Sequence, residues 1–232
     1  MTNRIPDKSL CNAARVNGYG ILIMLATGPF AFIVLSILTV PGDAATTANN
    51  IKANEWLFSI AIVSFLIVIT IDVLFAQAFY VIFKPVNKNL ALLAAFFRLM
   101  HAIIFAISMG FLFSVLLDQS YALVYINAFN NGYMIGQTFF FVPHLLVLGY
   151  LVLKSGHIPR IMGVLLIIGA SLGYLLDGIT YFLFPNYAAI AYPGLAVATI
   201  AELSLSLWLF LKGAKIPEMN TEIDSLQHLK KN

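Results

Sequence analysis

Charged residues are scarce in this sequence. Asp, Glu, Lys and Arg make up 10% of its 232 residues, whereas soluble domains carry roughly 25%. Apolar residues make up 61%. A chain with so little polar surface cannot cover a water-exposed fold, so the composition excludes a soluble globular protein and predicts a polytopic membrane protein.

Cysteine is almost absent, and so are catalytic signatures. The single residue, Cys11, excludes an internal disulfide and a cysteine-based metal cage. The chain has no HExxH, P-loop or CxxC pattern, and no catalytic residue is expected. The net charge of +3 comes without a basic patch interleaved with aromatics. We therefore expect the protein to associate with the lipid bilayer and not with nucleic acid. The oligomeric state is left open.

Six apolar runs reach the roughly 20 residues that a membrane-spanning helix needs. They predict an all-α bundle of six transmembrane helices. The polar stretch 41–54 is expected to be a loop, and the mixed segment 118–133 to lie among the lipid headgroups. Glycines in the fifth run predict close helix packing. The six runs cover residues 18–40, 55–83, 90–117, 128–153, 160–184 and 190–211.

Basic residues indicate the orientation of the bundle. Of the 13 Lys and Arg residues, all but Lys52 and Arg98 fall on one side of the predicted spans. Because loops rich in Lys and Arg stay in the cytoplasm, both termini are predicted to be cytoplasmic. The domain boundaries follow as a cytoplasmic segment 1–17, a transmembrane domain 18–212 and a cytoplasmic tail 213–232. The expected location is the inner (cytoplasmic) membrane.

Several ionisable residues lie inside the predicted spans. Counting from the Lys residues at the cytoplasmic helix ends, five of them fall roughly 15–20 Å deep at 1.5 Å per residue. Asp177 lies nearer the outer face, and helical spacing adds Gln137, Thr199 and Ser206 as supporting residues. We call the five the mid-membrane layer, and they are the predicted ligand or proton site: Asp72, Arg98, His101, His144 and Glu202.

A charge at the bilayer centre costs roughly 2.5–3.5 kcal/mol, so such residues pair, lose their charge or line a wet cavity. We expect Arg98 to pair with Asp72 or with Glu202. The leading hypothesis is transport or sensing of a small polar or ionic ligand, with proton linkage as one form. Alternatives are an intramembrane enzyme or a haem protein ligated by His101 and His144, and a purely structural ion-pair network.

Cofactor binding is not predicted, although haem and metal stay open at this stage. Two histidines and nearby carboxylates are suitable metal ligands, but they stand on different helices and form no spaced ligand motif. For His144 alone, two interpretations remain: a hydrogen-bonded core histidine or a ligand. The adjacent Pro143 frees a backbone carbonyl that could accept from its ring or widen a site.

Four stretches resemble a known family across residues 13–213. The stretches are AARVNGYGILI, NEWLFSIAIVSFLIVITIDVLFAQAFYVIFKPVNKNLALLAAFFRLMHAII, VPHLLVLGYLVLKSGHIPRIMGVLLIIGASLGYLLDG and AELSLSLWLFLKG. They are similar to a bacterial membrane family, domain of unknown function 4386. The resemblance implies an all-helical integral membrane protein. It implies no activity, so no functional residue is carried over.

Overall fold

The computed structural model describes residues 8–212, and these form an all-helical bundle. Six helical spans are long and apolar enough to cross a membrane, which confirms the predicted fold class. The predicted cytoplasmic tail 213–232 and the first seven residues of the predicted segment 1–17 lie outside the described residues.

Spans one to three and span six each cross as one α-helix, whereas spans four and five are interrupted. Spans one to three are α1 (Lys8–Leu38), α3 (Glu55–Phe83) and α4 (Lys88–Leu117). Span four comprises α5 (Ala122–Gly136), η2 (Gln137–Phe141) and α6 (Val142–Ser155). Span five comprises α7 (Arg160–Ile168), η3 (Gly169–Leu175) and α8 (Leu176–Leu183), and span six is α9 (Tyr192–Lys212). Short elements complete the chain: α2 (Ala44–Ala53), η1 (Gln119–Tyr121) and η4 (Pro185–Ala191).

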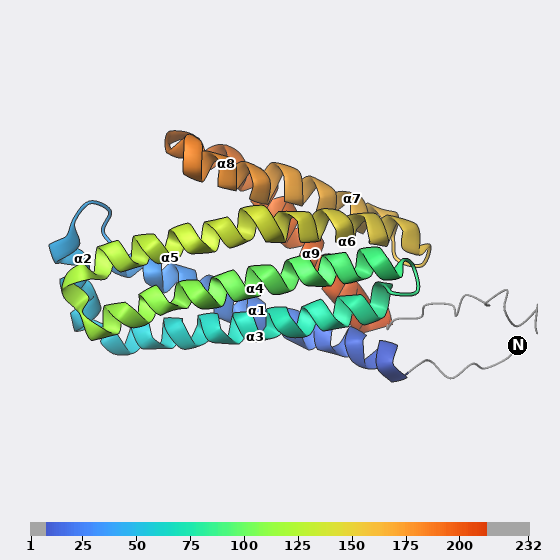
Figure 1. The fold of residues 1–232 in the computed structure, drawn as a ribbon, viewed down its shortest axis with the longest axis horizontal. Helices are drawn as coiled ribbons and strands as arrows, with labels where there is room; N and C mark the ends of the chain where they lie inside the picture. The colour runs from blue at the N-terminus through green and yellow to red at the C-terminus, as the bar shows by residue number, and fades with distance from the viewer. Residues whose placement is uncertain (1–7, 213–232) are drawn as a thin grey trace, which may run out of the picture.

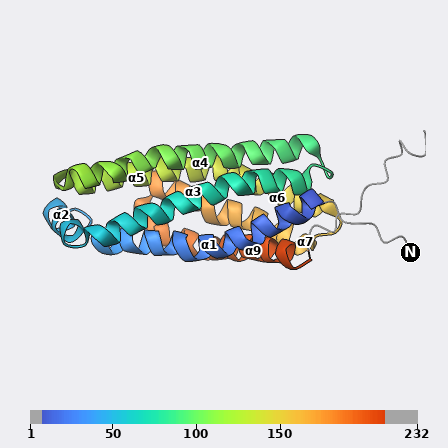
Figure 2. The ribbon, with the colours of Figure 1, turned by 90° about the horizontal axis from the view of Figure 1, so that it is seen from below.

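The spans lie side by side along one axis. The helix α1 packs against α3 and α9, and α4 packs between α3 and the fourth span (Figures 1 and 2). The fifth span runs beside α6, and α8, its part nearer the α2 end of the bundle, diverges from α5 in Figure 1. Both described ends, Lys8 and Lys212, lie at one end of the bundle, while α2 lies at the other.

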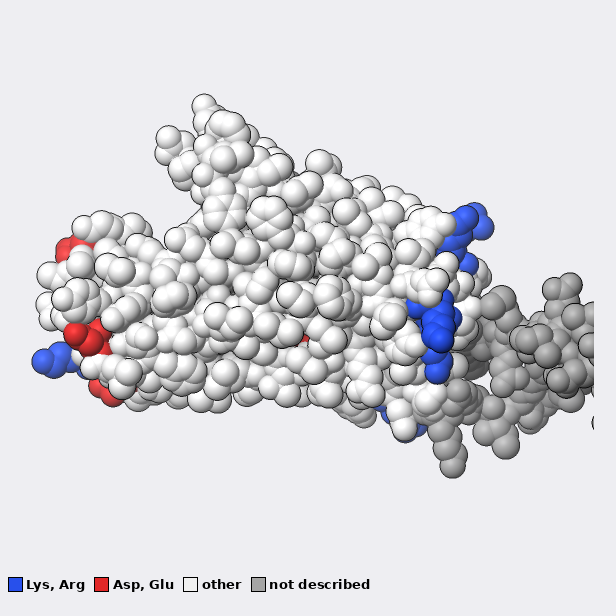
Figure 3. All heavy atoms as spheres, in the orientation of Figure 1, with Lys and Arg blue, Asp and Glu red and all other residues white. Residues whose placement is uncertain are grey.

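Charge gathers at the two ends of the molecule. Figure 3 shows Lys and Arg side chains clustered at the end where the described chain begins and finishes, with an almost uncharged surface between. Large apolar side chains such as Ile107, Leu117 and Leu211 are exposed along this surface. An apolar belt between charged ends is what a lipid bilayer requires of a spanning protein.

Three boundaries differ from those expected. The first helix begins at Lys8 rather than at residue 18, and the fourth span begins in the mixed segment, where Ile126 and Phe129 are buried. The expected loop 41–54 contains α2. Asp43 caps this helix because its carboxylate accepts hydrogen bonds from the Thr46 hydroxyl (2.6 Å) and backbone N–H (2.9 Å), and these bonds lower the pKa of Asp43.

Both interrupted spans contain a π-helical segment. The segment η2 immediately precedes Val142 and Pro143. Proline has no N–H, and its ring clashes with the carbonyl four residues earlier, so a widened turn relieves the helix at that point. The segment η3 contains two glycines, at 169 and 173.

Glycines bring the fifth and sixth spans into backbone contact. A Cβ on Gly173 would lie 2.6 Å from the carbonyl oxygen of Gly194, and one on Gly194 would lie 1.8 Å from the carbonyl oxygen of Leu172. No real side chain tolerates such distances. The close packing predicted for the glycine-rich fifth run is therefore confirmed.

Candidate functional site

The mid-membrane layer is built around an ion pair between α3 and α4. A short turn joins these two antiparallel helices, so residues equally far from the turn face each other. Nη2 of Arg98 donates to Oδ1 of Asp72 at 2.5 Å, and the two residues are only 2% and 1% exposed. Of the two partners expected for Arg98, the structure selects Asp72.

His144 joins the pair from α6. Its Nδ1 lies 2.9 Å from the backbone oxygen of Ala94, and its Nε2 lies 3.1 Å from Nη1 of Arg98. A carbonyl oxygen can only accept and a guanidinium can only donate, so Nδ1 carries the proton and Nε2 does not. The geometry thus requires the neutral ring, and His144 is a hydrogen-bonded core histidine.

His101 lies on the other side of Asp72, one turn along α4 from Arg98. Its Nδ1 is 3.2 Å from Oδ2 of Asp72, which is close enough for an ion pair when the ring is protonated. The two atoms do not meet hydrogen-bond geometry. The ring also packs against Phe141, with 4.9 Å between centroids. We call Asp72, Arg98, His101 and His144 the charged cluster.

Aromatic rings enclose the guanidinium of Arg98. Its Cζ lies 5.0 Å from the ring centroid of Phe75, 5.2 Å from that of Phe141 and 5.7 Å from that of Phe79. Cation–π attraction stabilises a desolvated cation in such a position. The cluster is therefore a packed group of charges, with the faces of three rings taking the place of water.

Glu202 stands apart from the charged cluster. Its Oε1 accepts a hydrogen bond of 3.0 Å from the hydroxyl of Tyr174 in η3. Among the described residues no Lys, Arg or His lies within ion-pair distance of this carboxylate. Glu202 and Arg98 instead line the same void of about 10 Å³, which is close to the smallest space that holds one water.

Of the predicted supporting residues, one lies beside Glu202, one pairs with Asp177, and one lies away from the site. Ser206 is buried and lines the void beside Glu202. Gln137 donates from Nε2 to Oδ2 of Asp177 at 3.0 Å, so these two form a separate polar pair. Thr199 does not join the site: it is exposed and its hydroxyl bonds to the Leu195 carbonyl of its own helix. The three-residue spacing from Glu202 predicted a shared face of α9, but Thr199 is exposed in the structure.

The two imidazoles do not fit a bis-histidine haem. An axial ligand needs a ring nitrogen directed at the iron, and both nitrogens of His144 already have protein partners. Within residues 8–212, no group of three or more His, Cys, Asp or Glu side chains is arranged to hold a metal ion.

Sequence reasoning missed the aromatic members of the site. Tyr174 carries the hydrogen bond to Glu202, and Phe141 separates Arg98 from Tyr174, with 5.3 Å between the Phe141 and Tyr174 centroids. Aromatic residues are too frequent in this chain to stand out. A usable signal did exist, because Tyr174 lies three residues before Asp177 and seven before Tyr181, which are spacings that share one helix face.

Comparison with known proteins finds a family match that covers most of the chain. Residues 16–213 match the family model described as Domain of unknown function (DUF4386). The chain belongs to this family. It is 33% identical over 160 residues to an uncharacterized protein of Archaeoglobus fulgidus, which covers 68% of this chain and 87% of the relative. No solved structure matches the chain. The resemblance predicted for residues 13–213 is confirmed, and the DUF4386 membership fits the membrane-spanning bundle.

Proposed function

We propose that this DUF4386 protein transports or senses a small polar or ionic species in the cytoplasmic membrane, and that Glu202 binds a proton in that process. One observation supports this above all. Glu202 is the carboxylate of the mid-membrane layer that faces a neutral hydroxyl instead of a cation. A carboxyl group can keep that hydrogen bond whether or not it carries a proton, because its second oxygen is free to gain or lose one.

The size of the void restricts what the layer accepts. A space of about 10 Å³ between Arg98 and Glu202 admits a proton or one water and no organic solute. A larger ligand requires the surrounding helices to separate. The segments η2 and η3 contact each other, and Tyr174 of η3 hydrogen-bonds Glu202 at the void. π-helical turns are frequent at functional sites.

Proton flux into vesicles tests the proposal. Purified protein is reconstituted in phosphatidylethanolamine–phosphatidylglycerol vesicles that contain the pH dye pyranine, with valinomycin present to remove the membrane potential. After an external acid pulse, the wild-type vesicles should acidify faster than protein-free vesicles, and Glu202→Gln should remove that excess. Glu55→Gln is the matched control, because Glu55 is an exposed carboxylate at the outer end of α3.

A sensing role needs a separate readout, since a sensor binds protons without flux. Trp208 lies on α9 six residues after Glu202 and packs against the core. In a Trp56→Phe background its emission should change between pH 5 and pH 8, and Glu202→Gln should abolish the change. Trp208 emission that does not change with pH, together with a proton flux equal to that of protein-free vesicles, would overturn both the transport and the sensing form of the proposal.

A structural function is the second candidate, and the direct pairing within the charged cluster favours it. Arg98 hydrogen-bonds both Asp72 and His144 in a packed region enclosed by aromatic rings, although its Nε has no hydrogen-bond partner. On this alternative the cluster only holds α3, α4 and α6 together. It predicts no Glu202-dependent flux or emission change, so the same two measurements distinguish the candidates.

A further inference from the structure

Three polar side chains form a stripe on the fifth span. Tyr174, Asp177 and Tyr181 are spaced by three and four residues, so they share one face of η3 and α8. At about 1.5 Å per residue, Tyr181 lies roughly 10 Å further toward the outer end than Tyr174. We call these three residues the polar stripe.

Each member of the polar stripe hydrogen-bonds a different helical segment. Tyr174 donates to Glu202 of α9 at 3.0 Å. Asp177 accepts from Gln137 of η2 at 3.0 Å. Tyr181 donates to Oδ1 of Asn131 of α5 at 2.8 Å. The stripe therefore follows the seam between the fifth span and the rest of the bundle, and its inner end is Glu202.

The seam is exposed at its outer end and stays partly exposed further in. Asn131 is exposed and Tyr181 is 37% exposed. Asp177, Tyr174 and Glu202 are all partly buried, whereas Ser206 and Arg98, which lie beyond Glu202, are 2% exposed each. Ionisable residues inside membrane spans are rare and usually mark a path for ions or protons, so a run of hydroxyl, amide and carboxyl groups along one seam points to such a path.

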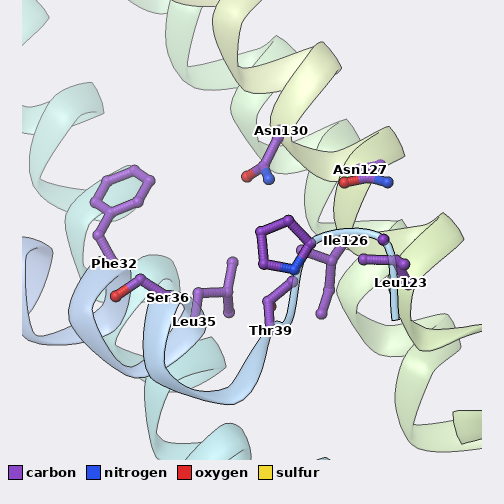
Figure 4. A pocket seen from close by; sticks show the side chains of 10 residues that line it. Phe32, Leu35, Ser36, Thr39, Leu123, Ile126, Asn127 and Asn130 are labelled. Carbon is purple, nitrogen blue, oxygen red and sulfur yellow. The ribbon is translucent and has the colours of Figure 1, made fainter. Parts of the chain in front are cut away.

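A pocket lies at the outer end of the same region of α5. It has a volume of about 430 Å³ and lies between the end of α1 and the beginning of α5. In Figure 4 the amides of Asn127 and Asn130 border this pocket opposite Ser36 and Thr39. Its lining carries no formal charge. Asn130 immediately precedes Asn131, the outermost partner of the polar stripe.

The charges along the seam favour a cation. Asp177 and Glu202 are its ionisable carboxylates, and its other polar groups are neutral. The basic residues gather at the opposite end of the bundle, apart from Lys52 in α2 and the paired Arg98. An acidic, neutral-walled seam attracts protons and small cations and disfavours anions.

We propose that the pocket and the polar stripe form an outward-facing access route by which protons or small cations reach Glu202. The pocket collects them at the outer face, and Tyr181, Asp177 and Tyr174 lead from it to Glu202. This proposal rests on the proposed function, because Glu202 is its inner end. Water access to the stripe is nevertheless measurable without any assumption about proton exchange.

Cysteine labelling tests the route. In a Cys11→Ser background, which removes the single native thiol, Asn131→Cys and Asp177→Cys are introduced separately. Right-side-out membrane vesicles are treated from outside with trimethylammonioethyl methanethiosulfonate, which does not cross membranes. A thiol in hydrocarbon stays protonated and unreactive, so both seam positions should react about tenfold or more faster than lipid-facing controls. The controls are Ile135→Cys on α5 and Ile179→Cys on α8, which are 42% and 39% exposed.

Charge preference gives a second readout in the same samples. Asn131→Cys retains Asp177, so the cationic reagent should react about tenfold faster than anionic sulfonatoethyl methanethiosulfonate after correction for their rates with a free thiol. If Asp177→Cys does not fold, Gln137→Cys occupies the same level of the seam and replaces it. Seam positions that react no faster than the two isoleucine controls overturn the route.

The outcomes separate the route from the proposed function. Reactive seam positions without Glu202-dependent proton exchange leave the route standing and refute the proposed function. Unreactive positions with Glu202-dependent exchange refute the route, because protons then reach Glu202 from the cytoplasmic end.

Discussion

Two carboxylates at similar depth, the buried Asp72 and the partly buried Glu202, are held in opposite ways. Asp72 faces a guanidinium and an imidazole among aromatic rings, and its cluster joins α3, α4 and α6. Glu202 faces a tyrosine hydroxyl and a small void, and it stands between the fifth and sixth spans. An ion pair in hydrocarbon is strong only while both members stay charged, whereas a carboxyl–hydroxyl pair tolerates either protonation state. If Glu202 exchanges a proton as proposed, the layer has a fixed part at Asp72 and an exchangeable part at Glu202.

Replacing the Arg98 cation by an anion should prevent the protein from folding stably. Arg98→Glu places a second carboxylate against Asp72, and removing one partner of a buried pair alone costs roughly 3–5 kcal/mol, close to the total stability of many proteins. We expect no monodisperse folded protein in fluorescence-detected size-exclusion chromatography. Arg15→Glu, an exposed position on α1, is the control and should behave like wild type. Normal recovery and melting of Arg98→Glu would show that the pair is dispensable.

Neutralising each carboxylate in turn compares the two parts directly. Asp72→Asn leaves Arg98 charged and uncompensated, so it should lower the free energy of unfolding by about 3–5 kcal/mol in an SDS titration. The double variant Asp72→Leu/Arg98→Leu should recover much of that loss, since it leaves no buried charge unpaired. Equal losses in the single and double variants would contradict an ion-pair origin.

Glycines let the backbones of the fifth and sixth spans approach closely. Gly194→Ala must push η3 and α9 apart, because the new Cβ would lie 1.8 Å from the carbonyl oxygen of Leu172; overpacking of this kind costs about 1–3 kcal/mol. Gly110→Ala is the matched control, as a Cβ there meets no atom within 4 Å. The control should be neutral or stabilise α4 by roughly 0.5–1 kcal/mol. A thermal melt of both variants measures the contrast, and equal shifts would count against close packing.

The smallest stability effects are expected at the exchangeable part. Glu202→Gln keeps an acceptor for the Tyr174 hydroxyl, and Tyr174→Phe removes one hydrogen bond, so each should cost about 1 kcal/mol or less in the same SDS titration. Glu202→Gln should nevertheless remove the proton-dependent signals. A stability loss as large as that of Asp72→Asn would mean that Glu202 is as firmly fixed as Asp72.

Depth was predictable for the mid-membrane layer, and pairing was not. Counting residues from the basic helix ends brought Asp72, Arg98 and His144 to one level, and the structure brings them into contact. The same count could not choose between Asp72 and Glu202 as the partner of Arg98. That choice depends on which helices are neighbours and how each is rotated about its axis, and hydrophobic periodicity is weak in helices that are apolar on every side.

Two local features also could not be predicted from the sequence pattern. Thr199 and Glu202 are three residues apart, yet one is exposed and the other hydrogen-bonds Tyr174. The helix α2 was expected to be a loop because its residues are polar, but capping by Asp43 and burial of Ile51 stabilise it. Burial of Ile51 and the Tyr174 bond to Glu202 depend on other parts of the chain, which the local pattern does not reveal.

Composition, run length and the placement of Lys and Arg were enough to predict the membrane-spanning class, the six spans and the depth of the ionisable residues, because the bilayer acts on each segment separately. The folded arrangement was needed to show that Asp72 pairs with Arg98, that His144 is held as the neutral tautomer, and that Glu202 borders a void and has no ion-pair partner. Those features need side chains from helices far apart in the chain to meet, and packing among the spans brings them together.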